Sequence, residues 1–300
     1  MPIMSISSRT KIMLQIFFSY SISFIIAIWL FLLFKASNVA IETIAPPNSI
    51  WNTVYFFGLI IVETIILIVL LRIFWKINFI KIIDILVCLV CVFSIASFFF
   101  EFWFMSLLIS FLVVLVKELS GWVWFKNAIV FLVVGFFSAY IGYTLGICPI
   151  FLLLVLIAIY DYIAVFKTKH MVFLADKIIN KNTLFVMDFH SSFFNKERNK
   201  EQITQNVNTE IKQKELDPSK RNHLHLGTGD FALPLIGVMT LFAANWIFGL
   251  VSFVVVLFGL ELTVYLLFTK KHYALPAIPL QVICFAGVYL IYLLYTLLYT

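Results

Sequence analysis

The segment LGTGDFAL, residues 226–233, contains the most informative residue of the chain, Asp230. This segment opens an apolar run that continues to Phe242. An aspartate at the centre of a membrane helix costs about 2.5–3.5 kcal/mol on permissive insertion scales, so intramembrane acids usually face protein or water and carry function. Gly227 and Gly229 remove side chains just before the acid, which lets a second helix or an extended peptide approach the backbone closely.

A second acid can be brought to the same depth. Asp161 interrupts another apolar run, and Lys167 marks the water-facing end of that run six residues later. Asp230 lies five residues after His225, at the start of its own run. At about 1.5 Å rise per residue, we expect each aspartate roughly 7–9 Å inside its helix from the same end. Because one polar connection joins these antiparallel helices, the spacing predicts two carboxylates at one level.

The composition indicates a membrane protein. The chain has 300 residues, of which 63% are hydrophobic and 12% charged, and its mean hydropathy is +1.07. A water-soluble domain of this size carries more polar surface, so we expect the lipid bilayer to be the main partner. The net charge of +6 is better explained by loop residues that set topology than by nucleic-acid binding.

The apolar runs predict an all-α polytopic fold with nine transmembrane helices. The run over residues 82–116 is too long for one crossing, since about 35 residues would exceed 50 Å against roughly 30 Å of hydrocarbon. We therefore divide it at Glu101. The expected spans are residues 12–34, 51–75, 82–116 as two spans, 123–143, 149–166, 226–243, 246–268 and 274–298.

These spans form one predicted membrane-embedded domain over residues 1–300. Residues 12–166 carry the first six spans, 167–225 form a partly disordered cytoplasmic loop, and 226–300 carry the last three. In that loop, residues 171–179 have helical spacing suited to the membrane surface, and 183–187 have the pattern of a short strand. Lys and Arg are concentrated in alternate connections, which predicts a cytoplasmic N-terminus, a C-terminus outside, and aspartates nearer the cytoplasmic face.

Neither a metal nor a cofactor is expected. Cys88 and Cys91 form a C-x-x-C pattern without a second Cys pair or a nearby His, so we interpret them as small apolar residues of the interior. The histidines gather near the cytoplasmic side without the spacing of zinc ligands. They are His170, His190, His223, His225 and His272.

Three short motifs together resemble the signatures of presenilin-type intramembrane aspartyl proteases. They are Tyr160–Asp161, the GxGD motif Gly227–Asp230, and LPAIP over residues 275–279. The run over residues 160–171 is particularly similar to archaeal presenilin homologues, and the resemblance covers essentially the whole chain. Two positions depart from the family pattern, Ile278 where a leucine is usual and Thr228 between the glycines. The related signal peptide peptidases share both aspartates in the opposite orientation, and the charge pattern here favours the presenilin orientation.

The resemblance implies a hydrolase of the archaeal cell membrane that cuts transmembrane segments of other proteins, and the sequence requires no accessory subunit. Asp161 and Asp230 would be catalytic. In the third motif, two prolines bar a regular helix start and bring the backbone close to the site. The residues that would contact substrate are Tyr160, Leu226, Gly227, Thr228, Gly229, Pro276, Ala277 and Ile278.

The chemistry follows from two carboxylates in a medium of low dielectric. Two such groups a few ångströms apart cannot both ionise, so they share one proton. One would take a proton from a water while the other donates to the peptide carbonyl, and no metal or covalent nucleophile is needed. A substrate helix must unwind to expose its backbone, and residues 222–226, beside 184–187, could pair with it as a strand.

Two other functions stay open at this point. Intramembrane aspartates also serve as ion or proton carriers in transporters, although we find no inverted repeat. A membrane scaffold that binds helices without cutting them would tolerate Asp→Asn at both sites. Three further acids lie in apolar runs: we expect Asp84 to reach the interface from a helix end, and Glu63 and Glu261 to pair with hydroxyls or Tyr.

Overall fold

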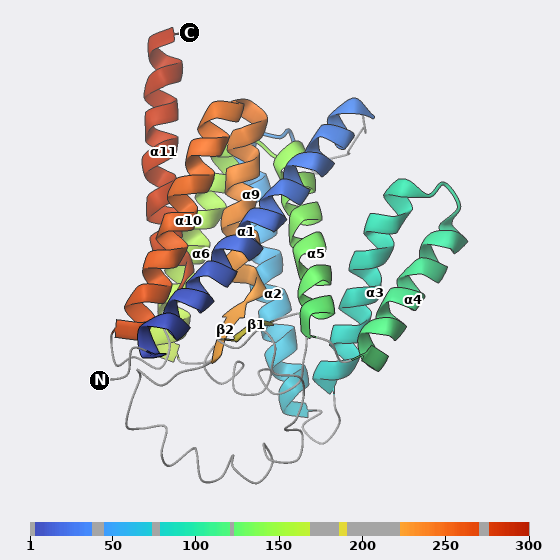
Figure 1. Cartoon of the computed structure of the whole chain (residues 1–300). Helices are drawn as coiled ribbons and strands as arrows, with labels where there is room; N and C mark the ends of the chain where they lie inside the picture. The colour runs from blue at the N-terminus through green and yellow to red at the C-terminus, as the bar shows by residue number, and fades with distance from the viewer. Residues whose placement is uncertain are drawn as a thin grey trace.

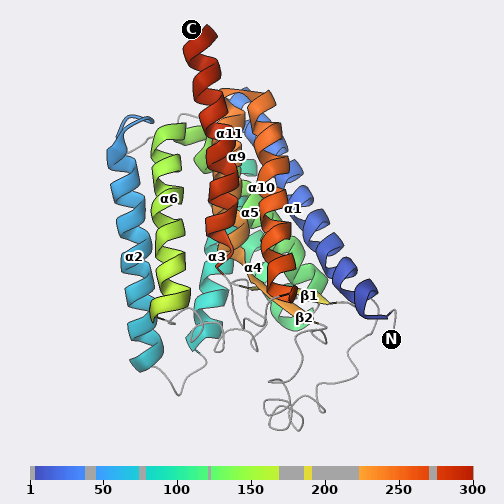
Figure 2. The ribbon, with the colours of Figure 1, turned by 90° about the vertical axis from the view of Figure 1, so that its left-hand side faces the viewer.

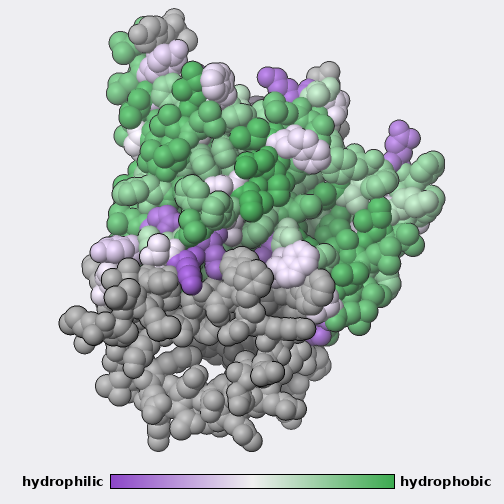
Figure 3. Space-filling model, viewed as in Figure 1, coloured by the Kyte–Doolittle hydropathy of each residue, from purple (hydrophilic) through white to green (hydrophobic). Residues whose placement is uncertain are grey.

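The computed structural model describes residues 4–37, 45–73, 79–120, 123–168, 186–190, 223–269 and 276–299. Within these ranges it contains nine α-helices, seven of which are long and apolar enough to cross a membrane. Hydrophobic residues cover most of the helical part of the face shown in Figure 3. The chain is therefore a multi-pass integral membrane protein, and its all-helical bundle agrees with the predicted fold class.

The helices lie close to the predicted spans. Their bounds are α1 Met4–Ala36, α2 Ile50–Ile73, α3 Phe79–Phe99, α4 Trp103–Ser120, α5 Val123–Thr144, α6 Ile147–Ile163, α9 Thr228–Ala244, α10 Trp246–Thr269 and α11 Ile278–Tyr299. The division at Glu101 is confirmed, because the chain leaves the helical conformation between α3 and α4 there. α1 begins and α11 ends at opposite ends of the bundle (Figure 1), as an odd number of crossings requires.

α9 is the central helix of the bundle. It packs against α5, α10, α6, α11 and α1 (Figures 1 and 2), and its residues from Pro234 to Leu241 are all buried. Gly237 permits the close approach of α6, because a Cβ at this position would lie 2.7 Å from the Leu154 Cδ1 atom. A larger residue would force the Leu154 side chain to move, in the contact between the two helices that carry Asp161 and Asp230.

α2 lies beside α6 on the outside of the bundle (Figure 2). The Thr53 Oγ1 hydroxyl donates a 2.8 Å hydrogen bond to the Pro149 carbonyl oxygen, which fixes the two helices at the end where both begin. Glu63 is exposed on α2. On α10, both carboxylate oxygens of Glu261 are buried and have no hydrogen-bond partner in the described part of the chain, so the expected pairing with a hydroxyl is not found.

α3 and α4 form a hairpin at one side of the bundle (Figure 1). A buried ion pair between Asp84 and Lys117 joins these two helices. Lys117 also contacts Glu118 at 3.2 Å, and Glu118 contacts Lys81 at 2.9 Å. The expectation that Asp84 reaches the interface is wrong, because a cation on the neighbouring helix neutralises it inside the protein.

A small antiparallel sheet lies at the end of the bundle where α6 ends and α9 begins (Figure 1). It pairs β1 (Val186–His190) with β2 (His223–Gly227), and Leu224 and Leu226 face the bundle as buried residues. The strand predicted over residues 183–187 is observed over Val186–His190, and residues 183–185 lie outside the described residues. The surface helix predicted over 171–179 and most of the 167–225 loop lie outside the described residues.

Candidate active site

Asp161 is positioned by the end of α6. It is buried, with 8% of its surface exposed, and its neighbour Tyr160 is half-buried. Two residues beyond it the regular helix gives way to a π-helical turn, Ala164–Thr168. The Ala164 N–H is directed at the carbonyl oxygens of both Asp161 and Tyr160. Such π-turns occur frequently at functional sites, where they redirect side chains.

Asp230 lies in the first turn of α9. Its carboxylate accepts a hydrogen bond from the backbone N–H of Gly227, the extended residue that caps the helix. This is the return half of a capping box, in which an acid at the third helical position satisfies the N–H of the cap. Asp230 therefore lies nearer the start of its helix than its distance from His225 predicted. The reason is that residues 223–227 form β2, so α9 begins only at Thr228.

The start of α11 reaches the same place. Ala277 and Ile278 are buried and Pro276 is half-buried. The backbone N–H of Ile278, the first residue of α11, donates a hydrogen bond to the Asp161 carboxylate. The first N–H groups of a helix have no partner within the helix, so they are available to an anion. The third sequence motif thus contacts the first one through the backbone.

The two carboxylates come together because α6 packs against α9. Asp161 and Asp230 are close enough for a direct electrostatic interaction between their charges. One Asp161 oxygen, Oδ2, is buried without a hydrogen-bond partner among the described residues. A buried carboxylate oxygen without a partner is costly unless it carries a proton or meets a donor, which suits a site that binds a proton and a water.

The two glycines of the motif differ in their surroundings. A Cβ on Gly227 would lie 3.2 Å from Asp230 Oδ2, whereas a Cβ on Gly229 would have no described atom within 4 Å. Gly229 is exposed, Thr228 is half-buried, and Leu226 is buried on β2. Gly227 leaves room for the carboxylate, and Gly229 leaves open surface beside it. Of the predicted site residues, Leu226 belongs to the core that supports this turn. Phe231, which was not a predicted site residue, belongs to the same core and stacks on Phe189 of β1.

Gln281 is a residue of this site that the sequence motifs did not indicate. Its side chain is fully buried, and its Nε2 amide donates to the backbone oxygens of Asp230 at 3.2 Å and Ala277 at 3.1 Å. In the sequence, Gln281 stands out only as a single amide in the apolar run that follows LPAIP. Its role can be inferred only together with Pro234, which lies on another helix, four residues after Asp230.

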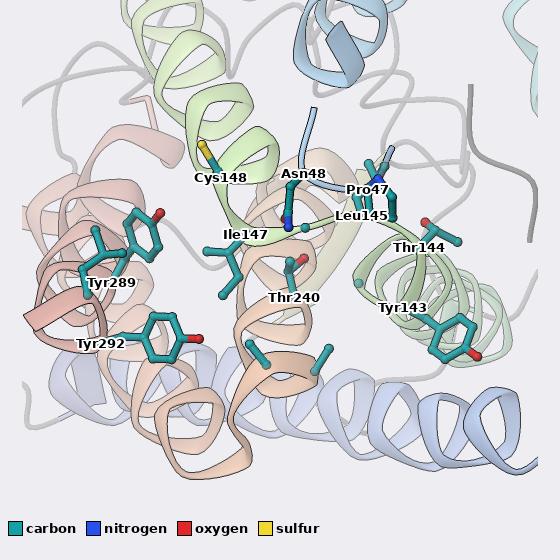
Figure 4. Close-up of a pocket in the computed structure, with 15 residues that line it drawn as sticks. Pro47, Asn48, Tyr143, Thr144, Leu145, Ile147, Cys148, Thr240, Tyr289 and Tyr292 are labelled. Carbon is teal, nitrogen blue, oxygen red and sulfur yellow. The ribbon is translucent and has the colours of Figure 1, made fainter. Parts of the chain in front are cut away.

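A cavity lies beside the residues that precede α2 and α6, and Figure 4 shows the side chains that line it. Its volume is ≈ 520 Å³, and its lining includes Asn48, Tyr143, Thr240, Tyr289 and Tyr292. Thr240 is ten residues beyond Asp230 on α9, which corresponds to about 15 Å along a helix. The cavity is therefore separate from the paired aspartates.

A bundle of apolar helices that brings two intramembrane aspartates together defines a polytopic membrane protein with a paired-carboxylate site. The family described as signal-peptide peptidase, presenilin aspartyl protease matches residues 17–296 of the chain. The chain belongs to this family, whose members are aspartic endopeptidases and thus hydrolases. The resemblance seen in the motifs is confirmed.

Two solved structures of a presenilin family intramembrane aspartate protease share the fold. The structure in the P2 space group has a TM-score of 0.60 at 20% identity, with 93% of this chain and 97% of that chain covered. The structure in the C222 space group has a TM-score of 0.56 at 20% identity, with coverage of 91% and 97%. A comparison with curated proteins gave no significant match.

Proposed function

We propose that this protein is an intramembrane endopeptidase in which Asp161 and Asp230 activate a water molecule to hydrolyse peptide bonds within transmembrane segments of other membrane proteins. The observation that carries the proposal is the convergence of three separate chain segments on two carboxylates. α6 supplies Asp161, α9 supplies Asp230, and the Ile278 N–H of α11 holds the Asp161 carboxylate. The Asp161 Oδ2 atom has no hydrogen-bond partner among the described residues, which leaves it available to a proton or a water in this proposal.

In the proposed mechanism the pair holds one proton, because two neighbouring charges in a low dielectric repel strongly. The ionised aspartate removes a proton from the bound water as the water attacks the peptide carbonyl. The protonated aspartate donates its proton to the carbonyl oxygen, which gives a tetrahedral intermediate. The aspartate that took the proton from water then donates it to the leaving nitrogen, while the other aspartate takes a proton from a hydroxyl of the intermediate. The C–N bond breaks, a carboxylic acid and an amine form, and the pair again holds one proton. The shared proton belongs to the pair rather than to one residue.

Substrate binding would use the open surface beside Gly229. A peptide bond inside a helix is shielded, so the substrate must unwind locally, and its freed backbone groups need partners in the membrane. β2 is already paired with β1 on one edge, so an extended substrate would add along the other edge of β2. The proposed contacts are Tyr160, Leu226, Gly227, Thr228, Gly229, Pro276, Ala277 and Ile278.

The finer topology is part of the same proposal. All nine helices would cross the membrane, with a cytoplasmic N-terminus and the aspartates nearer the cytoplasmic face, as the distribution of Lys and Arg favours. The shortest α-helices, α6 and α9, have 17 residues each, which is at the lower limit for a crossing. Residues 1–300 would form one protease domain that works without an accessory subunit, in a prokaryotic, archaeal cell membrane.

A transporter that uses the same aspartates is the competing function, and membership of a protease family argues against it. The two are separated by reconstituting the protein in liposomes with a single-span substrate. Cleavage products are identified by mass spectrometry, and ion flux is measured in the same vesicles. A cut within the span, blocked by a transition-state analogue of aspartyl proteases, supports the protease. Flux without cleavage would support the transporter, and binding without either would support a scaffold.

A further inference from the structure

α9 contains a proline at a position that affects Asp230 directly. In a regular α-helix the N–H of residue 234 would donate to the carbonyl oxygen of residue 230. Residue 234 is Pro234, which has no N–H to donate. The backbone carbonyl of Asp230 is therefore deprived of its helical donor, at the residue whose side chain forms half of the proposed catalytic pair.

The side chain of Gln281 supplies the missing donor. Its Nε2 atom lies 3.2 Å from the Asp230 carbonyl oxygen and 3.1 Å from the Ala277 carbonyl oxygen. Both partners are acceptors, so the amide must present its NH₂ group to them. Prolines within membrane helices are tolerated when a neighbouring helix satisfies the freed backbone group, and Gln281 of α11 does this for α9.

The same turn of α11 also holds the other aspartate. Ile278 donates its N–H to the Asp161 carboxylate, and Gln281 stands three residues later, on the same face of the helix. One helical turn therefore contacts Asp161 through the backbone and Asp230 through a side chain. A movement of α11 relative to α9 would change the separation of the two carboxylates.

We propose that Gln281 is a positioning residue for the aspartate pair, and that it acts by replacing the hydrogen bond that Pro234 removes. The proposal rests on the proposed function for its effect on catalysis, while the hydrogen bond itself can be tested without activity. Gln281 does not touch the reacting atoms. It sets where the first turn of α9, and with it the Asp230 carboxylate, lies relative to Asp161.

The test is a double-mutant cycle of Gln281→Met and Pro234→Ala in the full-length protein. Gln281→Met keeps the volume of the side chain and removes its donors, so we expect kcat to fall about 10- to 100-fold from a small displacement of Asp230, with little change in KM. Pro234→Ala restores the N–H at position 234. In that background the same Gln281→Met change should lower kcat less than about threefold, because the carbonyl has its own helical donor again.

Thr240→Val is the matched control on the same helix. The Thr240 hydroxyl donates a 2.8 Å hydrogen bond to the Ile236 carbonyl oxygen. Residue 240 also has a backbone N–H that can donate to this carbonyl, so the carbonyl keeps a helical donor when the hydroxyl is removed. Thr240→Val should therefore leave kcat unchanged and show no coupling to Pro234→Ala. A loss of kcat from Gln281→Met that is equal in both backgrounds would overturn the proposal. The split between kcat and KM separates positioning from substrate contact.

The thermal midpoints of the same variants in detergent give a reading that does not need activity. A Gln281→Met decrease in midpoint that shrinks in the Pro234→Ala background supports the bond, and equal decreases contradict it. If Gln281→Met does not fold, recovery of folded protein in the double variant supports the proposal, and failure to recover contradicts it. An inactive wild type would contradict the proposed function, while the midpoints still decide the role of Gln281.

Discussion

Gly227 and the Asp230 carboxylate are in contact: the Gly227 N–H donates to the carboxylate, and a Cβ on Gly227 would lie 3.2 Å from Oδ2. This spacing is tighter than an ordinary van der Waals contact, so the carboxylate would have to move. We expect Gly227→Ala to lower kcat about 10-fold or more, because small misplacements of a catalytic group are costly. Kinetics with a transmembrane substrate check this, and a variant with the kcat of the wild type would show that the carboxylate tolerates the shift.

Gly229→Ala should behave differently. The added methyl group meets no described atom within 4 Å, so the fold and the position of Asp230 should be preserved. If the substrate backbone lies along Gly229, the methyl group occupies part of that space and raises KM while kcat changes less. Gly229→Ala also serves as the control for Gly227→Ala, because both variants replace a glycine of the same motif with alanine. An unchanged KM would place the substrate elsewhere.

The strand β2 gives a third prediction. Leu224 is paired with Phe189 of β1 and is buried. Leu224→Pro removes a backbone N–H from the strand, so we expect cleavage of a transmembrane substrate to fall more than about 10-fold while the helix content measured by circular dichroism is retained. Leu224→Ile, which keeps the N–H, is the control. Full activity of the proline variant would exclude strand pairing at this edge as a requirement for cleavage.

The ion pair between α3 and α4 should matter for stability and not for chemistry. Lys117→Met removes the cation that pairs with the buried Asp84, and the loss of one partner of a buried pair costs about 3–5 kcal/mol. We expect a lower thermal midpoint and an unchanged kcat for the folded fraction. Lys81→Met removes the exposed end of the same network and should cost less than about 1 kcal/mol. A similar loss of stability in Lys117→Met and Lys81→Met would contradict the prediction, because it would mean that burial does not determine how much the Asp84–Lys117 ion pair contributes.

Much of the helical architecture could be predicted because apolar runs in membrane proteins are long and clearly bounded. The break at Glu101 followed from the length of the run, and the alternation of Lys and Arg between connections supported it. The position of Asp84 could not be predicted in the same way, because its partner Lys117 is 33 residues distant on another helix. Packing between helices, rather than the pattern along one of them, decides whether such a charge is buried or reaches the interface.

The pairing of the two aspartates was predicted from their equal depth and from three motifs. Two details of the site were not. Asp230 lies in the first turn of α9 because β2 extends to Gly227, so the helix begins at Thr228 and not at the predicted residue 226. Gln281 became visible only when the fold placed it against a carbonyl that Pro234 leaves without a donor.

The most direct test of the catalytic pair compares acids at different places in the bundle. Purified wild type, Asp161→Asn and Asp230→Asn are incubated with one single-span substrate, and the products are identified by mass spectrometry. Glu63→Gln and Glu261→Gln serve as matched controls, because each neutralises an acid of an apolar helix outside the pair. We expect both asparagine variants to fold and to lose cleavage within the span, and both glutamine variants to retain it. Cleavage at the wild-type rate by either asparagine variant would contradict the assignment of Asp161 and Asp230 as the catalytic pair.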